Sequence, residues 1–317
     1  MNRSIFSGGP AFIIRNGISI QLMADWKAET EIVTKDRSTN LRGRVGAWED
    51  YTMTKITGRA VVTATNLAAL LAELFPYTPA MVGQTIFPDV DLPLVIQTKD
   101  GRSITYAASA LTKMPDVNLA PGEDLLGDFE YTCLLANGAD AADDDSHVVE
   151  ASSSYTEPTL NPLGIIAARY DFAWGAISPF DAIETDEKGV SLKPKVSFND
   201  LQTQRDGLQN MRIKEVTAEL GFTPVNLASE DFYNLVIPQG SSAGRGKAMG
   251  ARGLAFTATP LGSGAGRPSL SVPLAVPTKS PLQFGSNSRI GDVTMMCEQK
   301  ATVGVIGDLF TLAATTE

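Results

Sequence analysis

Residue types that carry the commonest protein chemistries are scarce in this chain. It has one histidine, His147, and two cysteines, Cys133 and Cys297. A Ser-His-Asp or Cys-His catalytic group would have to use that single histidine, and cysteines so far apart in the sequence do not form the closely spaced pairs of a zinc site. We therefore expect no catalytic residue, no metal and no cofactor. Both cysteines are expected to be small buried residues in a reducing compartment.

Long apolar runs are also missing. No run approaches the roughly 20 residues that cross a bilayer, and the first residues lack the apolar core of a signal peptide. We expect that the protein is made in the cytoplasm and does not associate with a membrane. The formal net charge of −10 argues against binding DNA or RNA, which needs clustered basic side chains. The same charge is compatible with an acidic wall past which DNA slides, and equally with a surface that keeps the protein soluble.

Two stretches imitate ligand-binding motifs and fail on spacing. Gly240–Lys247 is rich in glycine, but a phosphate-binding loop needs glycine in place of Ser241 and a hydroxyl residue in place of Ala248. The acidic segment Asp140–Asp145 lacks the alternating ligands, the central glycine and the final glutamate of a calcium loop. We expect a surface loop at the first stretch and a solvated linker at the second.

The two halves of the chain repeat short sequences in the same order. Residues 56–68 and 216–228 share five identities in thirteen positions at an offset of 160. The Gly-Asp pair at 127–128 and Cys133 match the Gly-Asp pair at 291–292 and Cys297 at an offset of 164. A second, collinear match that pairs both cysteines indicates an internal duplication. We therefore predict two tandem domains, residues 1–150 and residues 151–317.

The same succession of elements is expected in each domain. In the first, Tyr51–Thr65 alternates and is rich in β-branched residues, which predicts a strand. Asn66 then stands at the N-cap of a short helix whose apolar face continues to Phe75, where a proline follows. In the second, Asn226 opens a helix with a weaker apolar stripe, which Pro238 ends.

Further strands follow each helix. They are expected at Leu92–Thr98, Arg102–Leu111 and Asp128–Leu135, and at Gly253–Thr259, Pro268–Val276 and Asp292–Lys300. The turn signal at 99–101 predicts a hairpin between the first two. The pattern predicts a mainly β fold with short helices: two tandem β-sandwich or barrel domains, each with a flanking helix. Residues 137–147, which include His147, and 151–162 are expected to form an exposed linker.

The early part of the first domain has a distinctive layout. From Gly17 to Phe75, a strand ending near Val33 is followed by a polar, charged stretch over 35–44, then the strand at 51–65 and the short helix. This layout resembles the tube domain of the tail tube proteins of long-tailed bacteriophages. The resemblance extends over the whole chain as a matter of layout and includes no diagnostic motif.

In that family, the long loop between early strands reaches the neighbouring ring of a stack. Its equivalent in the second domain would be the polar segment 198–209. The resemblance therefore gives as candidates for ring-to-ring contacts Lys35, Arg37, Arg42, Arg44, Asp200, Arg205 and Asp206. Plain solvated hairpin tips are the alternative interpretation of these residues.

The resemblance implies a structural virion protein. Most members have one tube domain and form hexameric rings, and some with a fused pair form trimers that imitate the hexamer. It implies that this chain assembles with itself into trimeric rings stacked into a tube, through which DNA passes without specific binding. Tape measure, tail terminator and distal tail proteins are the implied partners, and assembly in the bacterial host cytoplasm and residence in the virion tail are implied as well.

Other functions remain open at this point. A distal-tail or baseplate ring protein, or the inner tube of a contractile tail, would share the domain. A carbohydrate-binding or adhesin-like β-sandwich would need an aromatic platform, yet aromatic residues are 7% of the chain and Trp26, Trp48 and Trp174 do not cluster in the sequence. An enzyme would need a pocket with converging carboxylates, and acidic pairs such as Glu29 and Glu31 arise by chance among 36 acids.

Overall fold

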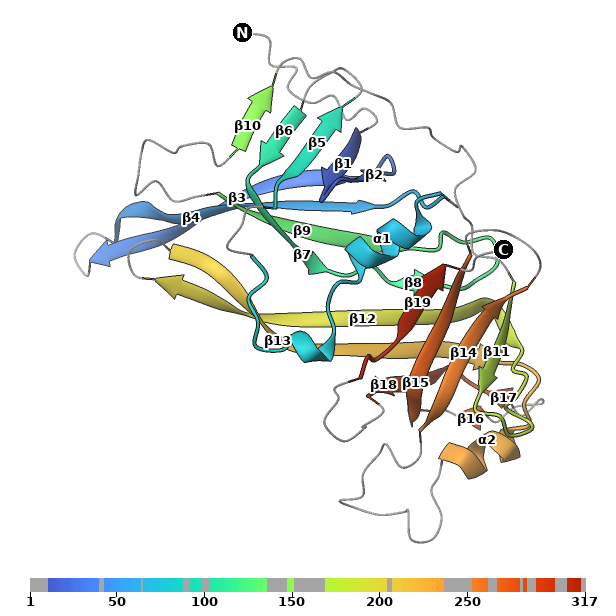
Figure 1. Ribbon diagram of the computed structural model, residues 1–317. Coiled ribbons are helices and arrows are strands. Elements are labelled where there is room, and N and C mark those ends of the chain that lie inside the picture. Colours follow the sequence, from blue (N-terminus) through green and yellow to red (C-terminus); the bar gives the residue numbers. More distant parts are fainter. Residues whose placement is uncertain are drawn as a thin grey trace.

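The structure is a computed structural model of the 317-residue chain (Figure 1). It describes residues 11–39, 43–63, 65–87, 92–98, 103–135, 147–150, 169–203, 207–236, 253–261, 267–279, 282–283, 289–299 and 307–314. Of these residues, 64% lie in strands and 7% in α-helices, so the expectation of a mainly β fold with short helices is confirmed. Within these ranges, no helix is long and apolar enough to cross a membrane.

Strands dominate both halves of the chain. In the first half the described elements are β1 (Ala11–Arg15), β2 (Ile18–Gln21), β3 (Lys27–Thr39), β4 (Gly43–Arg59), α1 (Leu67–Leu74), a 3₁₀ helix (Pro79–Met81), β5 (Leu94–Thr98), β6 (Ser103–Tyr106), β7 (Ala108–Lys113), β8 (Val117–Asn118), β9 (Asp128–Leu135) and β10 (His147–Glu150). In the second half they are β11 (Tyr170–Trp174), β12 (Thr185–Thr203), β13 (Gly207–Pro224), α2 (Ser229–Val236), β14 (Leu254–Pro260), β15 (Pro268–Lys279), β16 (Leu282–Gln283), β17 (Arg289–Ile290), β18 (Val293–Glu298) and β19 (Thr311–Ala314).

The strands form antiparallel sheets. One has the order β10-β6-β5-β1-β2 and a second the order β3-β4-β9-β7. A third has the order β11-β14-β15-β18-β13-β12-β8, with β19 on β15, and β16 pairs with β17. The third sheet therefore contains one strand from the first half, β8.

The two halves have corresponding strand orders. In the first half, neighbouring strands follow the order β1, β5, β6 with β7, β9, β4 and β3. In the second half, they follow the corresponding order β11, β14, β15, β18, β13 and β12. The difference lies at one place. A bend at Ala107 separates β6 from β7 and divides these strands of the first half between two sheets, whereas β15 runs unbroken and keeps the corresponding strands of the second half in one sheet.

The registers of corresponding strands also agree. Ile56 of β4 pairs with Tyr131 of β9, and Leu220 of β13 pairs with Met295 of β18. Both residues of the second pair lie 164 positions after those of the first. The offset of 164 found around the cysteines therefore describes the strands, and the match at 160 between residues 56–68 and 216–228 is displaced from it by four residues.

A bulge recurs in the strands next to these pairs. The register of β7 against β9 skips one residue at Thr112, and that of β15 against β18 skips one at Thr278. The Thr112 hydroxyl donates to the carbonyl of Glu130 at 3.3 Å, and the Thr278 hydroxyl donates to the carbonyl of Thr294 at 3.1 Å. Because Glu130 and Thr294 are also 164 residues apart, the two halves share this irregularity and the hydrogen bond that accompanies it.

One hydrophobic core runs through both halves, from Ala11 to Leu309. Cys133 and Cys297 are free and buried, as expected, and desolvation raises the pKa of each thiol to about 12. The chain also returns to its beginning near its end. β19 packs close to α1, and the rings of Phe75 and Phe310 meet edge to face with centroids 6.0 Å apart.

The expected lengths of β3 and β4 were wrong. β3 continues beyond Val33 to Thr39, and β4 begins at Gly43 rather than Tyr51 and ends at Arg59 rather than Thr65. Residues 27–36 are exposed or only partly buried on both faces of the strand. A strand without a buried face has no alternating hydrophobic pattern, so its polar sequence looked like a loop.

Two smaller expectations had mixed outcomes. Asn66 is the N-cap residue of α1, as expected, but its side chain makes no capping hydrogen bond; its Oδ1 accepts from the backbone N–H of Thr63 at 2.7 Å, and its Nδ2 donates to the carbonyl of Val61 at 3.3 Å. His147 does not lie in a linker, because it opens β10 opposite Tyr106. The rest of the expected linker, and the stretches imitating ligand motifs, lie outside the described residues.

Candidate assembly surface

Two long hairpins project to the same side of the molecule, at the left of Figure 1. We call β3–β4 the first hairpin and β12–β13 the second hairpin. The register shifts after Val33 and after Arg37 in the first hairpin, and after Ser197 and after Leu201 in the second. Each of these positions in the second hairpin lies 164 residues after its counterpart. Bulges fix where a hairpin bends and twists, so the two hairpins have matching irregularities along their length.

The hairpins pack against each other through a small apolar cluster that adjoins the main core. The cluster consists of Tyr51, Met53 and Leu208, with Val33, Leu134 and Met211 packed against it. It joins β4 of the first hairpin to β13 of the second. Burial of these side chains holds the hairpins side by side and extends the main core, against which Leu134 and Met211 also pack.

Main-chain hydrogen bonds extend this contact. The backbone of Ile213 in β13 accepts from the N–H of Gly83 at 2.8 Å and donates to the carbonyl of Gln84 at 2.9 Å. The Asn210 side chain binds the backbone of Phe87 in both directions, accepting at 3.1 Å and donating at 2.8 Å. The segment after α1 thus covers β13 beyond the residues that β18 pairs with.

A second main-chain contact closes the outer edge of β12. Leu192 of β12 faces Val117 of β8, and the N–H of Leu119 donates to the carbonyl of Val190 at 2.8 Å. The approach is close enough to require glycine at position 189, where an added Cβ would lie 2.3 Å from the carbonyl oxygen of Leu119 and where φ is +61°. Val190 and Leu192, beside this contact, are fully buried in the main core.

The corresponding edge of the first hairpin is uncovered. β3 is the end strand of its sheet, and within the described residues no strand pairs with its outer side. Ala28 and Thr30 are exposed, and Ile32 is 58% exposed. Because an open strand edge presents unpaired backbone groups, it is a site for pairing with another strand.

The predicted contact residues are distributed along these hairpins. Lys35 of β3 and Asp200 of β12 are exposed, in the outer halves of the two hairpins. The backbones of Arg37 and Arg44 lie in β3 and β4, where they face Gly46 and Ser38. Arg42, Arg205 and Asp206 lie outside the described residues. The described candidates are therefore brought to the same side of the molecule, and their role in assembly remains a prediction.

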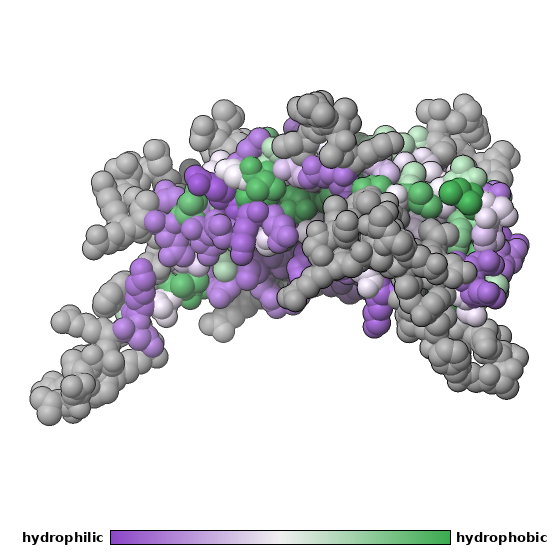
Figure 2. Space-filling model, turned by 90° about the horizontal axis from the view of Figure 1, so that it is seen from below, coloured by the Kyte–Doolittle hydropathy of each residue, from purple (hydrophilic) through white to green (hydrophobic). Residues whose placement is uncertain are grey.

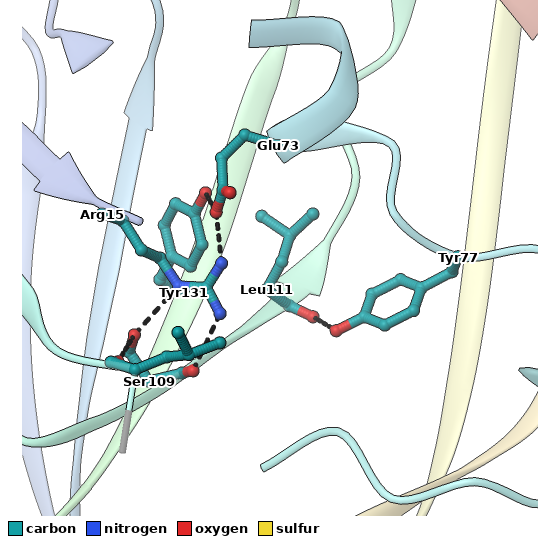
Figure 3. A network of polar contacts seen from close by, with 7 residues as sticks. Arg15, Glu73, Tyr77, Ser109, Leu111 and Tyr131 are labelled. Carbon is teal, nitrogen blue, oxygen red and sulfur yellow. Dashed lines mark hydrogen bonds and ion pairs between the residues drawn. The ribbon is translucent and has the colours of Figure 1, made fainter. Parts of the chain in front are cut away.

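A buried polar network, which sequence reasoning did not find, lies beneath α1 (Figure 3). Arg15 of β1 forms an ion pair with Glu73 of α1, and its other donors bind Ser109 of β7, at 3.0 Å to the hydroxyl and 3.1 Å to the carbonyl. The hydroxyl of Tyr131 donates to the same Glu73 carboxylate at 2.9 Å. The Arg15 guanidinium also lies over the Tyr131 ring, 5.3 Å from its centroid.

This network supports the fold. Burial is the largest cause that raises the pKa of the Tyr131 phenol well above its ordinary value, and the Glu73 carboxylate raises it further. Tyr77 lies next to the network, and its hydroxyl donates to the carbonyl of Leu111 at 2.5 Å. Arg15 and Glu73 are 9% and 6% exposed, so the charged groups face one another instead of a substrate. Their evident effect is to fasten α1 to three strands.

The largest cleft among the described pockets lies where the halves meet. It has a volume of about 780 Å³ and is lined by residues that include Pro121, Tyr170, Asp181, Glu184 and Asn226. Asp181 and Glu184 are exposed to solvent. Across the described part of the chain, no three His, Cys, Asp or Glu side chains gather in a way that could hold a metal ion.

Exposed apolar side chains are spread over the surface. They are Ile32, Val82, Ile177, Val225, Leu261 and Met296. In Figure 2 the apolar residues of the face shown form separate patches among hydrophilic ones. Trp174 is fully buried against Phe180, with ring centroids 5.3 Å apart. The part of the surface that the structure describes therefore presents no aromatic platform.

Comparison with known proteins gives no relative: no protein-family model matches the chain, and no curated protein matches it significantly. The function has to be argued from the chain's own sequence and geometry.

Proposed function

We propose that this chain is the subunit of a bacteriophage tail tube. In this proposal, three chains form a ring in which six similar domains imitate a hexamer, and rings stack into a tube through which DNA passes. The observation that carries the proposal is the contact between the two corresponding hairpins. The first hairpin contributes Tyr51 and Met53 of β4 to this contact, whereas the second contributes Leu208 of β13, which is not at the corresponding position. A contact between different faces can be repeated from chain to chain, and it closes into a ring when the rotation permits.

The tandem arrangement supports a ring of three chains. Residues 1–150 and 151–317 are proposed as two tube-like domains, on the ground that their strand orders correspond and that β4 with β9 and β13 with β18 pair in registers that correspond at an offset of 164. Joining two domains in one chain makes one contact per chain intramolecular, which raises its effective concentration to about the millimolar scale.

The charge of the chain suits a conduit for DNA. With a net charge of −10, lumen-facing acids would repel the phosphate backbone and prevent sticking. Tape measure, tail terminator and distal tail proteins are the partners that such a tube would require. Synthesis and assembly in the host cytoplasm, and residence in the virion tail, complete the proposal.

Electron microscopy of the purified protein together with its mass in solution tests the proposal. We expect hollow tubes or stacked rings and masses in multiples of three chains. A monomer that forms no ring at any soluble concentration, including in the presence of tube ends from disrupted virions, would contradict it.

A charge-reversal variant tests the hairpin ends. Replacing Arg37, Arg42 and Arg44 with glutamate should leave a folded protein that no longer grows tubes. The matched control reverses three bases outside the two hairpins, Lys113, Arg169 and Lys279, all of which are exposed. Tube growth that is equal in the two variants would argue against a role for the hairpin ends.

A distal-tail ring protein is the second candidate, because the same uncovered β3 edge would serve a ring that does not stack. The two functions differ in a single outcome of the microscopy: isolated rings that never lengthen would favour the distal-tail ring.

A further inference from the structure

We propose that a second copy of this chain docks on the free outer edge of β3, through the strand β16 of its own second half. The inference rests on the proposed tube function and deepens it, since it names the strands by which neighbouring subunits meet. Within one chain the corresponding contact is already present, because β8 of the first half pairs with β12 of the second half.

β16 occupies the place in the second half that β8 occupies in the first. Val117 of β8 bridges to Leu126, and Leu282 of β16 pairs with Ile290. Leu126 and Ile290 are 164 residues apart, and each is followed by a Gly-Asp pair that leads into the next strand. β16 pairs only with β17 in the described structure, so its other side corresponds to the side that β8 offers to β12.

β3 likewise corresponds to β12, with a contrast in burial. In β12, Val190 and Leu192 are fully buried in the main core, next to the edge that β8 pairs with. Their counterparts 164 residues earlier are Trp26, which is partly buried, and Ala28, which is exposed. The first hairpin therefore lacks the cover that the second hairpin receives from the first half.

The internal contact also gives the register between chains. Leu192 faces Val117 within the chain. Ala28 of β3 corresponds to Leu192, and Leu282 corresponds to Val117 through their partners Ile290 and Leu126, so Ala28 would face Leu282 of the second copy. Two or three residues paired in this way would close only part of the edge, so the adjoining surfaces of the hairpins must contribute as well.

The residues at those adjoining surfaces are complementary in charge. Within the chain, Tyr51 and Leu208 share the apolar cluster between the hairpins. Their counterparts at an offset of 164 are Glu215, which is exposed, and Arg44. Between chains, the acid of one copy would therefore stand where the base of the next copy approaches. This places Arg44 between neighbours in a ring rather than between rings.

Disulfide trapping in the full-length chain tests the pairing. Within the chain, the N–H of Leu119 donates to the carbonyl of Val190, so Val190 and Leu119 form a hydrogen-bonded pair and the next pair, Ser191 with Asn118, has no main-chain hydrogen bond. In the predicted register, Lys27 and Gln283 correspond to Ser191 and Asn118 and therefore face each other in a pair of the second kind. Such pairs bring Cα atoms to about 4.5 Å, which a disulfide can bridge. The variant Lys27→Cys, Gln283→Cys should form covalent oligomers on mild oxidation. Cys133 and Cys297 are buried and should not compete.

The control moves one cysteine along the same strand. Glu29→Cys with Gln283→Cys displaces the thiol by two residues, roughly 7 Å. We expect at least tenfold more covalent oligomer from the first variant. Equal trapping in both, with rings visible by electron microscopy, would overturn the strand pairing and leave the tube proposal standing. Failure of both variants to associate in any form would count against both proposals.

A charge exchange provides a second readout without cysteines. Arg44→Glu should weaken association by about tenfold, and adding Glu215→Arg should restore it. Restoration is not expected if Arg44 acts only between stacked rings. An Arg44→Glu variant that associates as tightly as the original chain would overturn this part of the inference.

Discussion

The two halves fasten their helices at the same place by different chemistry. In the first half, Arg15 donates to the carbonyl of Ser109 at 3.1 Å; in the second, the indole N–H of Trp174 donates to the carbonyl of Ala275 at 3.0 Å. Ser109 and Ala275 both lie three residues before the shared bulge in β7 and β15. Each half therefore supplies a buried donor to the backbone carbonyl at the corresponding position.

The surroundings of that donor differ completely. Arg15 is neutralised by Glu73 of α1, whereas Trp174 packs against Phe180 and against Phe232 of α2, with centroids 5.3 and 6.1 Å apart. At this position the backbone carbonyl needs a hydrogen-bond donor and the space beneath the helix has to be filled. The ion pair of the first half and the aromatic cluster of the second half each meet both needs. Two halves with one topology can therefore differ widely in sequence.

The largest effect is expected from breaking the ion pair. Glu73→Leu would leave the Arg15 guanidinium buried without a counter-charge and the Tyr131 hydroxyl without an acceptor, so we expect a loss of about 4 kcal/mol in the free energy of unfolding. Urea denaturation measures it. The double variant Arg15→Met, Glu73→Leu should recover most of the loss, because no unpaired charge remains. A single variant that costs less than about 1 kcal/mol would contradict the buried geometry.

A smaller effect is expected from the aromatic counterpart. Trp174→Phe removes the donor to the carbonyl of Ala275 and part of a buried side chain, so we expect a loss of about 2 kcal/mol. The control Trp26→Phe changes a partly buried side chain and should cost well under about 1 kcal/mol. Comparison of the two urea midpoints decides the matter, and equal shifts would count against the difference in burial.

The two cysteines should make both halves similarly sensitive to alkali. Burial raises the pKa of Cys133 and of Cys297 from 9.0 to about 12. Between these values the unfolded chain has released the thiol proton and the folded chain has not, so stability is full below pH 9 and falls as the pH rises. Each cysteine contributes a slope of about 1.4 kcal/mol per pH unit. Unfolding midpoints between pH 9 and 11 measure it, and Cys297→Ala should remove one cysteine's share; an unchanged slope would contradict this.

Sequence patterns predicted the elements that bury one face. β9 was expected at Asp128–Leu135 and has those bounds, and α1 buries the expected apolar face of Leu67, Leu70, Leu71 and Leu74. In both cases the period of the hydrophobic residues follows the geometry of the element. The outer part of β3 escaped prediction because its described residues 27–36 bury neither face of the strand.

The candidate site depended on pairings that a single sequence does not reveal. The partnership of Arg15 with Glu73 joins residues 58 positions apart, and that of Leu192 with Val117 joins the two halves. The match at 160 shows how a repeat can be detected with the wrong register. A displacement of four residues keeps every side chain on the same face of a strand, so the alternation agreed although the strand partners did not.

The contact between Phe75 and Phe310 has a consequence for synthesis. A ribosome adds roughly 5–20 residues per second, so a nascent chain would wait about 10 to 50 seconds between the emergence of α1 and the arrival of the segment that meets it. During that time the apolar side of Phe75 has no β19 to cover it. The first half therefore has to remain unaggregated for that time without its final contact, and the fold is completed only when the last residues of the chain have been made.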